Sequence, residues 1–142
     1  MTFYRYKDNK ITQLLINPSS IGNELAKLDV TLLSTEFNDL DETIQKIKEL
    51  YDYDGHDSFQ IWNELVKLNK HHHVEPESRL FLTGSGKYTF IQEDDIHFTV
   101  SVSPGDFIII PPNLKHYFNT LEQTSFIRFF PRNKINDTEL TG

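Results

Sequence analysis

The chain has 142 residues, the length of one ordinary domain, and its 37% hydrophobic and 25% charged residues are typical of a folded globular protein. Its 14 Lys and Arg against 21 Asp and Glu give a formal net charge of −7, which argues against nucleic acid or an anionic membrane as a partner. Cysteine is absent. This excludes disulfide scaffolds, thiolate zinc sites, iron–sulfur clusters and cysteine nucleophiles, so any metal must be held by His, Asp or Glu.

No targeting or membrane segment is visible in the sequence. The N-terminus lacks the apolar stretch of a signal peptide, and the longest apolar run, residues 107–112, is far too short to cross a bilayer. We therefore expect a cytoplasmic protein. With no repeat or low-complexity linker, we expect residues 1–142 to form a single domain, with a helical N-terminal third (1–69) and a β-barrel core (70–131).

Two amphipathic helices are predicted first. Residues 21–28 carry apolar side chains at helical spacing behind the cap signal Pro18-Ser19-Ser20. Residues 40–51 form the second, capped by Asn38 or Asp39, with acidic residues in the first turn and one apolar face.

A third, shorter helix is predicted over residues 59–66, after Asp57-Ser58, from the spacing of its apolar side chains. Two short strands accompany the helices in this part of the chain. They are expected at residues 3–6 and 30–33.

Short strands separated by Gly, Pro and Asp turns dominate from residue 71 onward, which is typical of a sandwich or barrel. Residues 96–102 alternate apolar and polar side chains, so one face is buried and His97 points outward. The strands are expected at 80–82, 87–92, 96–102, 107–110, 116–119 and 125–130.

The segment from residue 71 to residue 79 concentrates metal-ligating side chains. In an extended chain His71, His73, Glu77 and Arg79 share one face, although Pro76 interrupts the segment. Two imidazoles and a carboxylate suit iron, nickel, manganese or zinc. A fourth ligand must come from another strand, and His116, which follows a Pro-Pro-Asn turn, is the natural candidate.

Each of these residues also has a purely structural interpretation. A His-x-His pair is often two half-exposed strand histidines, and a single His116 is more often structural than a ligand. Glu77 could be an ordinary carboxylate paired with Arg79, and a lone arginine on a final strand, such as Arg128, is usually solvated. The spacing of the whole set favours the metal site.

That spacing resembles the two cupin motifs. His71-x-His73, three residues, Glu77, six residues and Gly84 match the first motif. Gly105, five residues, Pro111, four residues and His116 resemble the second, with Asn113 where a glycine is usual.

Within the cupin superfamily the chain resembles the acireductone dioxygenase family. The likeness rests on the ligand-type residues together with further matches, namely Arg79, Gly84-Ser85-Gly86, Gly105-Asp106, Phe118 and Arg128-Phe129-Phe130. It implies a mainly β fold, a cupin (double-stranded β-helix or jelly-roll) barrel with N-terminal α-helices. It also implies one Fe(II) or Ni(II) per chain, bound by His71, His73, Glu77 and His116.

The resemblance further implies the reaction. The expected substrates are O2 and the acireductone 1,2-dihydroxy-3-keto-5-methylthiopentene of methionine salvage. The iron form is expected to yield 4-methylthio-2-oxobutanoate and formate, and the nickel form 3-methylthiopropanoate, formate and carbon monoxide. Arg79 is expected to be catalytic by stabilising developing charge, and Arg79, Phe118 and Arg128 to bind substrate.

Two other functions stay open. The chain could be a cupin enzyme acting on another small anionic molecule, such as an isomerase, or a non-catalytic cupin that binds a metal or ligand. A sensor normally carries an output domain, for which 142 residues leave no room, so catalysis is favoured. We expect a monomer whose partners are small molecules.

Overall fold

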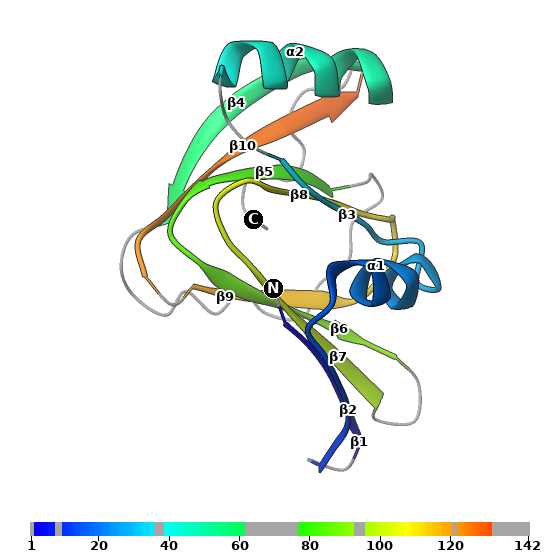
Figure 1. Ribbon diagram of the computed structural model, residues 1–142. Helices are drawn as coiled ribbons and strands as arrows, with labels where there is room; N and C mark the ends of the chain where they lie inside the picture. The colour runs from blue at the N-terminus through cyan, green and yellow to red at the C-terminus, as the bar shows by residue number, and fades with distance from the viewer. Residues whose placement is uncertain are drawn as a thin grey trace.

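The computed structural model contains two five-stranded antiparallel sheets (Figure 1). It describes residues 2–7, 10–35, 39–61, 77–92, 96–120 and 122–131. The elements in chain order are β1 (Phe3–Lys7), β2 (Lys10–Leu15), α1 (Pro18–Ala26), β3 (Thr31–Ser34), α2 (Leu40–Tyr51), β4 (Tyr53–Ile61), β5 (Glu77–Thr83), β6 (Gly86–Ile91), β7 (Ile96–Val102), β8 (Asp106–Ile110), β9 (His116–Thr120) and β10 (Thr124–Pro131).

The two sheets enclose a shared core. One has the strand order β2-β1-β7-β6-β9 and the other β3-β8-β5-β10-β4. Their facing side chains pack into a single apolar cluster, to which the first sheet contributes Phe90 and Val100 and the second contributes Phe81 and Ile108. Helix α1 adds Ile21 and seals part of this cluster. The mainly β barrel expected from the sequence is therefore confirmed.

Helix α2 lies on the outside of the barrel, above β4 and β10 in Figure 1. Its Ile44 and Ile47 pack against Phe107, Ile127 and Phe129 in a second apolar cluster. Neither α1, with 9 residues, nor α2, with 12, has the length to cross a membrane, and these are the helices of the described ranges.

Both amphipathic helices are confirmed, and only the first has different bounds from those expected. Helix α1 begins three residues earlier than expected because Asn17, not a serine, caps it: its Oδ1 accepts from the backbone N–H groups of Ser19 and Ser20. Helix α2 spans the expected range, and Asp39 caps it by accepting from the N–H of Glu42.

The third predicted helix is wrong where the structure describes it. Residues 59–61 belong to β4, a strand that pairs along nearly the whole length of β10, from Thr124 opposite Ile61 to Pro131 opposite Tyr53. Pairing with β10 satisfies the backbone hydrogen-bonding groups of this segment in a strand. The helical spacing of its apolar residues is therefore overridden by tertiary contacts. Residues 62–66 lie outside the described residues. Among the described residues up to 61, the expected helical third therefore holds four strands and two helices.

The strands predicted at 3–6, at 30–33 and in the second half of the chain are confirmed, with ends shifted by up to three residues and with 96–102 unchanged as β7. His97 is half-buried, whereas Thr99 on the same face is buried, and its hydroxyl bonds to that of Thr89 at 3.0 Å. At the turns, Gly105 has a φ of 94° and Asn113 a φ of 68°. Asn113 thus takes the left-handed conformation that glycine prefers and asparagine tolerates.

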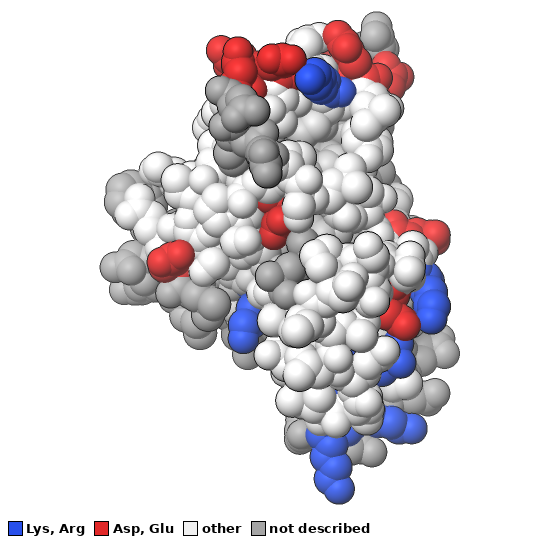
Figure 2. All heavy atoms as spheres, viewed as in Figure 1, with Lys and Arg blue, Asp and Glu red and all other residues white. Residues whose placement is uncertain are grey.

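Charge is distributed unevenly over the face shown in Figure 2. Acidic side chains gather at the α2 end, where Asp41 and Glu42 occupy the first turn of the helix. Basic side chains gather at the opposite end, near β1 and β2, where Lys7 and Lys10 are exposed. The acidic and the basic groups both lie on the surface and are separate from the buried charged residues inside the barrel.

Candidate metal centre

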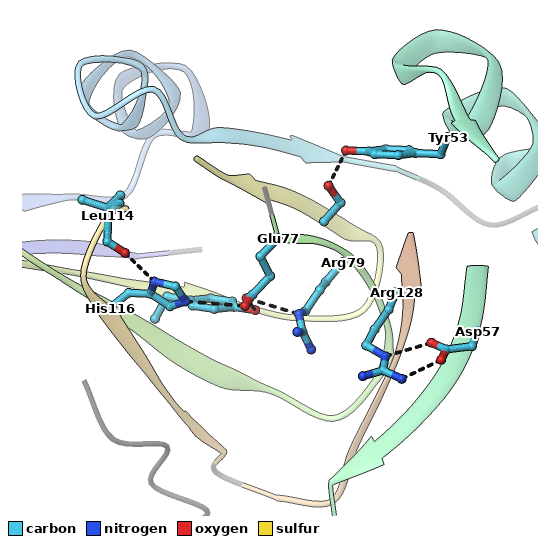
Figure 3. Close-up of polar contacts among 9 residues, drawn as sticks. Tyr53, Asp57, Glu77, Arg79, Leu114, His116 and Arg128 are labelled. Carbon is cyan, nitrogen blue, oxygen red and sulfur yellow. Dashed lines mark hydrogen bonds and ion pairs between the residues drawn. The ribbon is translucent and has the colours of Figure 1, made fainter. Parts of the chain in front are cut away.

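Glu77 is the first residue of β5, the central strand of its sheet, and is 6% exposed. Arg79 follows two residues later on the same face, and its Nε lies 3.2 Å from Glu77 Oε2 (Figure 3). The predicted shared face of Glu77 and Arg79 is confirmed, because alternate residues of a strand point to the same side. The other oxygen, Oε1, faces His116.

His116 opens β9, in the opposite sheet, and is 1% exposed. Its Nδ1 lies 2.8 Å from the backbone oxygen of Leu114. Since a carbonyl oxygen only accepts, Nδ1 carries the hydrogen of this bond, and Nε2 of the neutral ring carries the lone pair. That Nε2 lies 3.5 Å from Glu77 Oε1.

A carboxylate oxygen and an imidazole lone pair that face each other in a buried site both attract a cation. Either a proton on the histidine or a metal ion satisfies that arrangement. The bond from Nδ1 to a backbone carbonyl is also the type of contact that orients metal-ligating histidines. The donor set of Glu77 and His116 therefore fits a borderline divalent metal.

The other two expected ligands, His71 and His73, lie outside the described residues. Within the described part of the chain, no group of three or more His, Asp or Glu side chains comes together to hold a metal. Glu77 and His116 are thus the two expected ligands that the structure brings together.

Tyr88 is a member of this site that the sequence analysis missed. It lies on β6, is 1% exposed, and its hydroxyl donates to Glu77 Oε2 at 3.2 Å. Burial raises the pKa of Tyr88 well above its ordinary value of 10.0; the charge of Glu77 raises it further, and Arg79 partly opposes the shift. The predicted strand at 87–92 holds the only available signal, since alternation places Tyr88 and Phe90 on one face.

Arg79 is 2% exposed, and its guanidinium lies over the ring of Phe126 with 4.6 Å from Cζ to the ring centroid. Arg128 on β10 is the register partner of Arg79 on β5, so the two arginines stand side by side in the sheet. The structure does not leave Arg128 solvated. It is 7% exposed and held by Asp57 of β4 through two contacts, Nε to Oδ1 at 2.8 Å and Nη2 to Oδ2 at 2.5 Å.

The ring of Phe118 packs against that of Tyr88, whose hydroxyl donates to the Glu77 carboxylate. It is 4% exposed, and its ring centroid is 4.6 Å from that of Tyr88 and 5.7 Å from that of Phe81. It belongs to the main apolar cluster, so it forms part of the wall around the buried charged residues.

Two antiparallel sheets that enclose a buried glutamate and histidine from opposite sides define the class of the protein, a cupin barrel. The family profile described as the ARD/ARD' family matches residues 6–137, and the chain belongs to this family.

Curated relatives and a solved structure agree with this placement. An acireductone dioxygenase of Bacillus cytotoxicus is 26% identical over 90% of this chain and 77% of its own length, and one of Bacillus thuringiensis is 32% identical over 55% and 52%. For one of Bacillus pumilus, 28% identical, the chain likewise spans about half the length of the relative, 52%. The structure of acireductone dioxygenase from Bacillus anthracis with a cadmium ion in its active centre has the same fold, with a TM-score of 0.75, 21% identity and 93% of each chain covered.

Proposed function

We propose that this chain is a metal-dependent dioxygenase that cleaves an acireductone with O2, the reaction of methionine salvage. The observation that carries the proposal is the buried approach of His116 Nε2 to Glu77 Oε1 at 3.5 Å in a member of the ARD/ARD' family. The names of the curated relatives support the same activity, since each is an acireductone dioxygenase.

The proposed metal ligands are Glu77 and His116 together with His71 and His73. Three neutral imidazoles and one carboxylate give a divalent ion a net charge of about +1, which favours an anionic enediolate substrate. When bound, the metal supplies a Lewis acid and a template for the reacting oxygens.

Arg79 is the proposed catalytic side chain. Its guanidinium is buried beside Glu77 and Phe126, where a permanent positive charge is screened little by water. We propose that it pairs with an anionic oxygen of the substrate and stabilises the charge that develops there.

Arg128 and Phe118 are the other proposed substrate contacts. Arg128 stands beside Arg79 and is fixed in place by Asp57. Phe118 is part of an apolar wall that suits a methylthio tail and excludes water. We propose that this wall orients the apolar end of the substrate while the arginines hold its anionic end.

The metal is proposed to be Fe(II) or Ni(II), one per chain. Imidazole and carboxylate ligands accept both, because selectivity among first-row metals follows supply and geometry more than affinity. We propose that the bound metal selects the products: a 2-keto acid and formate with iron, or 3-methylthiopropanoate, formate and carbon monoxide with nickel.

Oxygen uptake after anaerobic reconstitution tests the proposal. The metal-free protein is loaded with Fe(II) or Ni(II), and a synthetic acireductone is added with O2 in an oxygen-electrode cell. We expect uptake with both metals and carbon monoxide only with nickel. If protein with one bound metal per chain consumes no oxygen in either form, the dioxygenase proposal is wrong and a binding function or another substrate takes its place.

A further inference from the structure

We propose that Tyr88 is a positioning residue of the metal centre: its hydroxyl holds one oxygen of Glu77 and thereby turns the other toward His116 and the metal. The inference rests on the proposed function, because it assigns Tyr88 a role toward the metal. It stands on two contacts of the Glu77 carboxylate, that of Oε2 with the Tyr88 hydroxyl and that of Oε1 with His116.

Oε2 of Glu77 is contacted by two side chains, Tyr88 and Arg79. The Tyr88 hydroxyl donates a hydrogen bond to it at 3.2 Å. Arg79 Nε also lies 3.2 Å away, but this contact is an ion pair that lacks hydrogen-bond alignment. Tyr88 therefore supplies a directional hydrogen bond to Oε2, whereas Arg79 supplies charge through this Nε contact.

Oε1 of Glu77 is the oxygen that looks toward the second ligand, His116, at 3.5 Å. A carboxylate with both oxygens unrestrained can rotate and offer a metal either oxygen or both. A donor fixed on Oε2 removes this freedom and prepares the group for binding through Oε1. Contacts of this kind to a ligating side chain typically change metal affinity 10- to 100-fold.

The position of the Tyr88 hydroxyl is set by the packing of its ring. The ring stacks on Phe90, with centroids 6.0 Å apart and an interplanar angle of 7°, and lies 4.6 Å from that of Phe118. Its centroid is also 6.3 Å from that of His116. Tyr88 thus touches both described ligands, one through its hydroxyl and the other through its ring (Figure 3 shows the Glu77–His116 pair).

The alternative is a purely structural role, in which the Tyr88 hydroxyl only needs a hydrogen-bond partner inside the barrel and has no effect on the metal. Tyr53 provides a matched comparison. Its hydroxyl bonds to that of Ser78, the neighbour of Glu77 on β5, but on the opposite face of the strand. Removal of either hydroxyl breaks one side-chain bond to β5, and only the loss at Tyr88 affects the carboxylate of Glu77.

The test compares Tyr88→Phe with Tyr53→Phe in the full chain. Both variants keep the aromatic ring, so the packing is preserved. The affinity of the metal-free proteins for Ni(II) is measured by competition with a chromophoric chelator, and thermal unfolding of the metal-free forms is followed by circular dichroism. We expect Tyr88→Phe to weaken Ni(II) binding by about tenfold or more, and Tyr53→Phe to leave it within about twofold of the original protein.

The outcomes separate the inference from the proposed function. Unchanged Ni(II) affinity in Tyr88→Phe, in a protein whose original form binds the metal, overturns the inference and leaves the proposed function standing. Equal weakening in both variants also overturns it, since the effect then follows general stability. If the original protein binds no Ni(II) or Fe(II), the proposed function fails, and the inference fails with it.

Discussion

Nε2 of His116 lies 3.5 Å from Oε1 of Glu77, although the two residues belong to different sheets of the barrel. Glu77 opens β5, the middle strand of one sheet, and His116 opens β9, an edge strand of the other. Because Nδ1 of His116 bonds to the backbone oxygen of Leu114, the ring turns its other nitrogen toward the carboxylate. This contact between Glu77 and His116 is therefore created by closure of the two sheets on each other.

The first prediction concerns Arg79. In Arg79→Ala the metal content should be unchanged, whereas kcat/KM for the acireductone should fall at least about tenfold, equivalent to roughly 1.4 kcal/mol of lost transition-state stabilisation. The reason is the loss of a buried positive charge at the proposed substrate site, beside Glu77. Steady-state oxygen uptake measures the effect, and metal analysis of the same sample is the control. Unchanged kinetics would mean that Arg79 forms only a structural ion pair with Glu77.

The second prediction concerns the pair of Asp57 and Arg128. Asp57→Asn removes the carboxylate that holds a buried guanidinium by two contacts. Since the Asp57 side chain is itself 39% exposed, we expect a loss of about 1–3 kcal/mol in the free energy of unfolding, less than for a fully buried pair. Chemical denaturation measures it.

An exposed ion pair supplies the control for that experiment. Lys46 and Glu42 lie one turn apart on α2, both well exposed, with 3.0 Å between Nζ and Oε1. Glu42→Gln should cost at most about 0.5 kcal/mol. If Asp57→Asn is as mild as this control, Arg128 does not depend on Asp57 for its place in the fold.

The third prediction contrasts two glycines. Gly105 has a φ of 94°, and a Cβ built there would lie 2.4 Å from the backbone oxygen of Thr35. Gly105→Ala should therefore destabilise the protein by about 2 kcal/mol or more, from left-handed strain and the clash. Gly22, inside α1, has nothing within 4 Å of such a Cβ, so Gly22→Ala should be neutral or stabilising by up to about 1 kcal/mol. Thermal unfolding compares the two, and equal effects would contradict the account of this turn.

The fourth prediction is a pH dependence. Burial raises the pKa of Tyr88 well above its ordinary value of 10.0, so the folded protein holds the phenolic proton more tightly than the unfolded chain. Stability is therefore retained below pH 10.0 and lost as the pH rises above it.

Ultraviolet absorbance and circular dichroism, followed together in an alkaline titration, check this prediction. Of the six tyrosines, Tyr88 should ionise only as the protein unfolds. Tyr88→Phe should reduce that late step in absorbance by one tyrosine, because burial also raises the pKa of Tyr53. Complete ionisation of all six tyrosines before any change in circular dichroism would contradict the assignment.

The part of the site that local periodicity controls could be predicted from the sequence. Glu77 and Arg79 share a face because they are two residues apart in a strand, and the spacing to His116 matched a known motif. The strand at 96–102 followed from plain alternation. For the two strands the signal lies in neighbouring residues, and for His116 it lies in the spacing of the motif that begins at Gly105.

The remaining features depend on pairings between distant strands. Asp57 meets Arg128 only because β4 pairs with β10, and Tyr88 meets Glu77 only because β6 and β5 face each other across the barrel. The error at residues 59–61 has the same origin. Their apolar spacing also suits a helix, and pairing with β10 selects the strand.

Metal content tests the central claim most directly. The original protein, His116→Ala, Glu77→Gln and the control His97→Ala, which alters a half-buried histidine of β7, are each reconstituted with Fe(II) without oxygen, desalted and analysed by mass spectrometry. We predict one metal per chain in the original protein and in His97→Ala, and little metal in the other two. Full metal content in both His116→Ala and Glu77→Gln would contradict the assignment of these two residues as ligands.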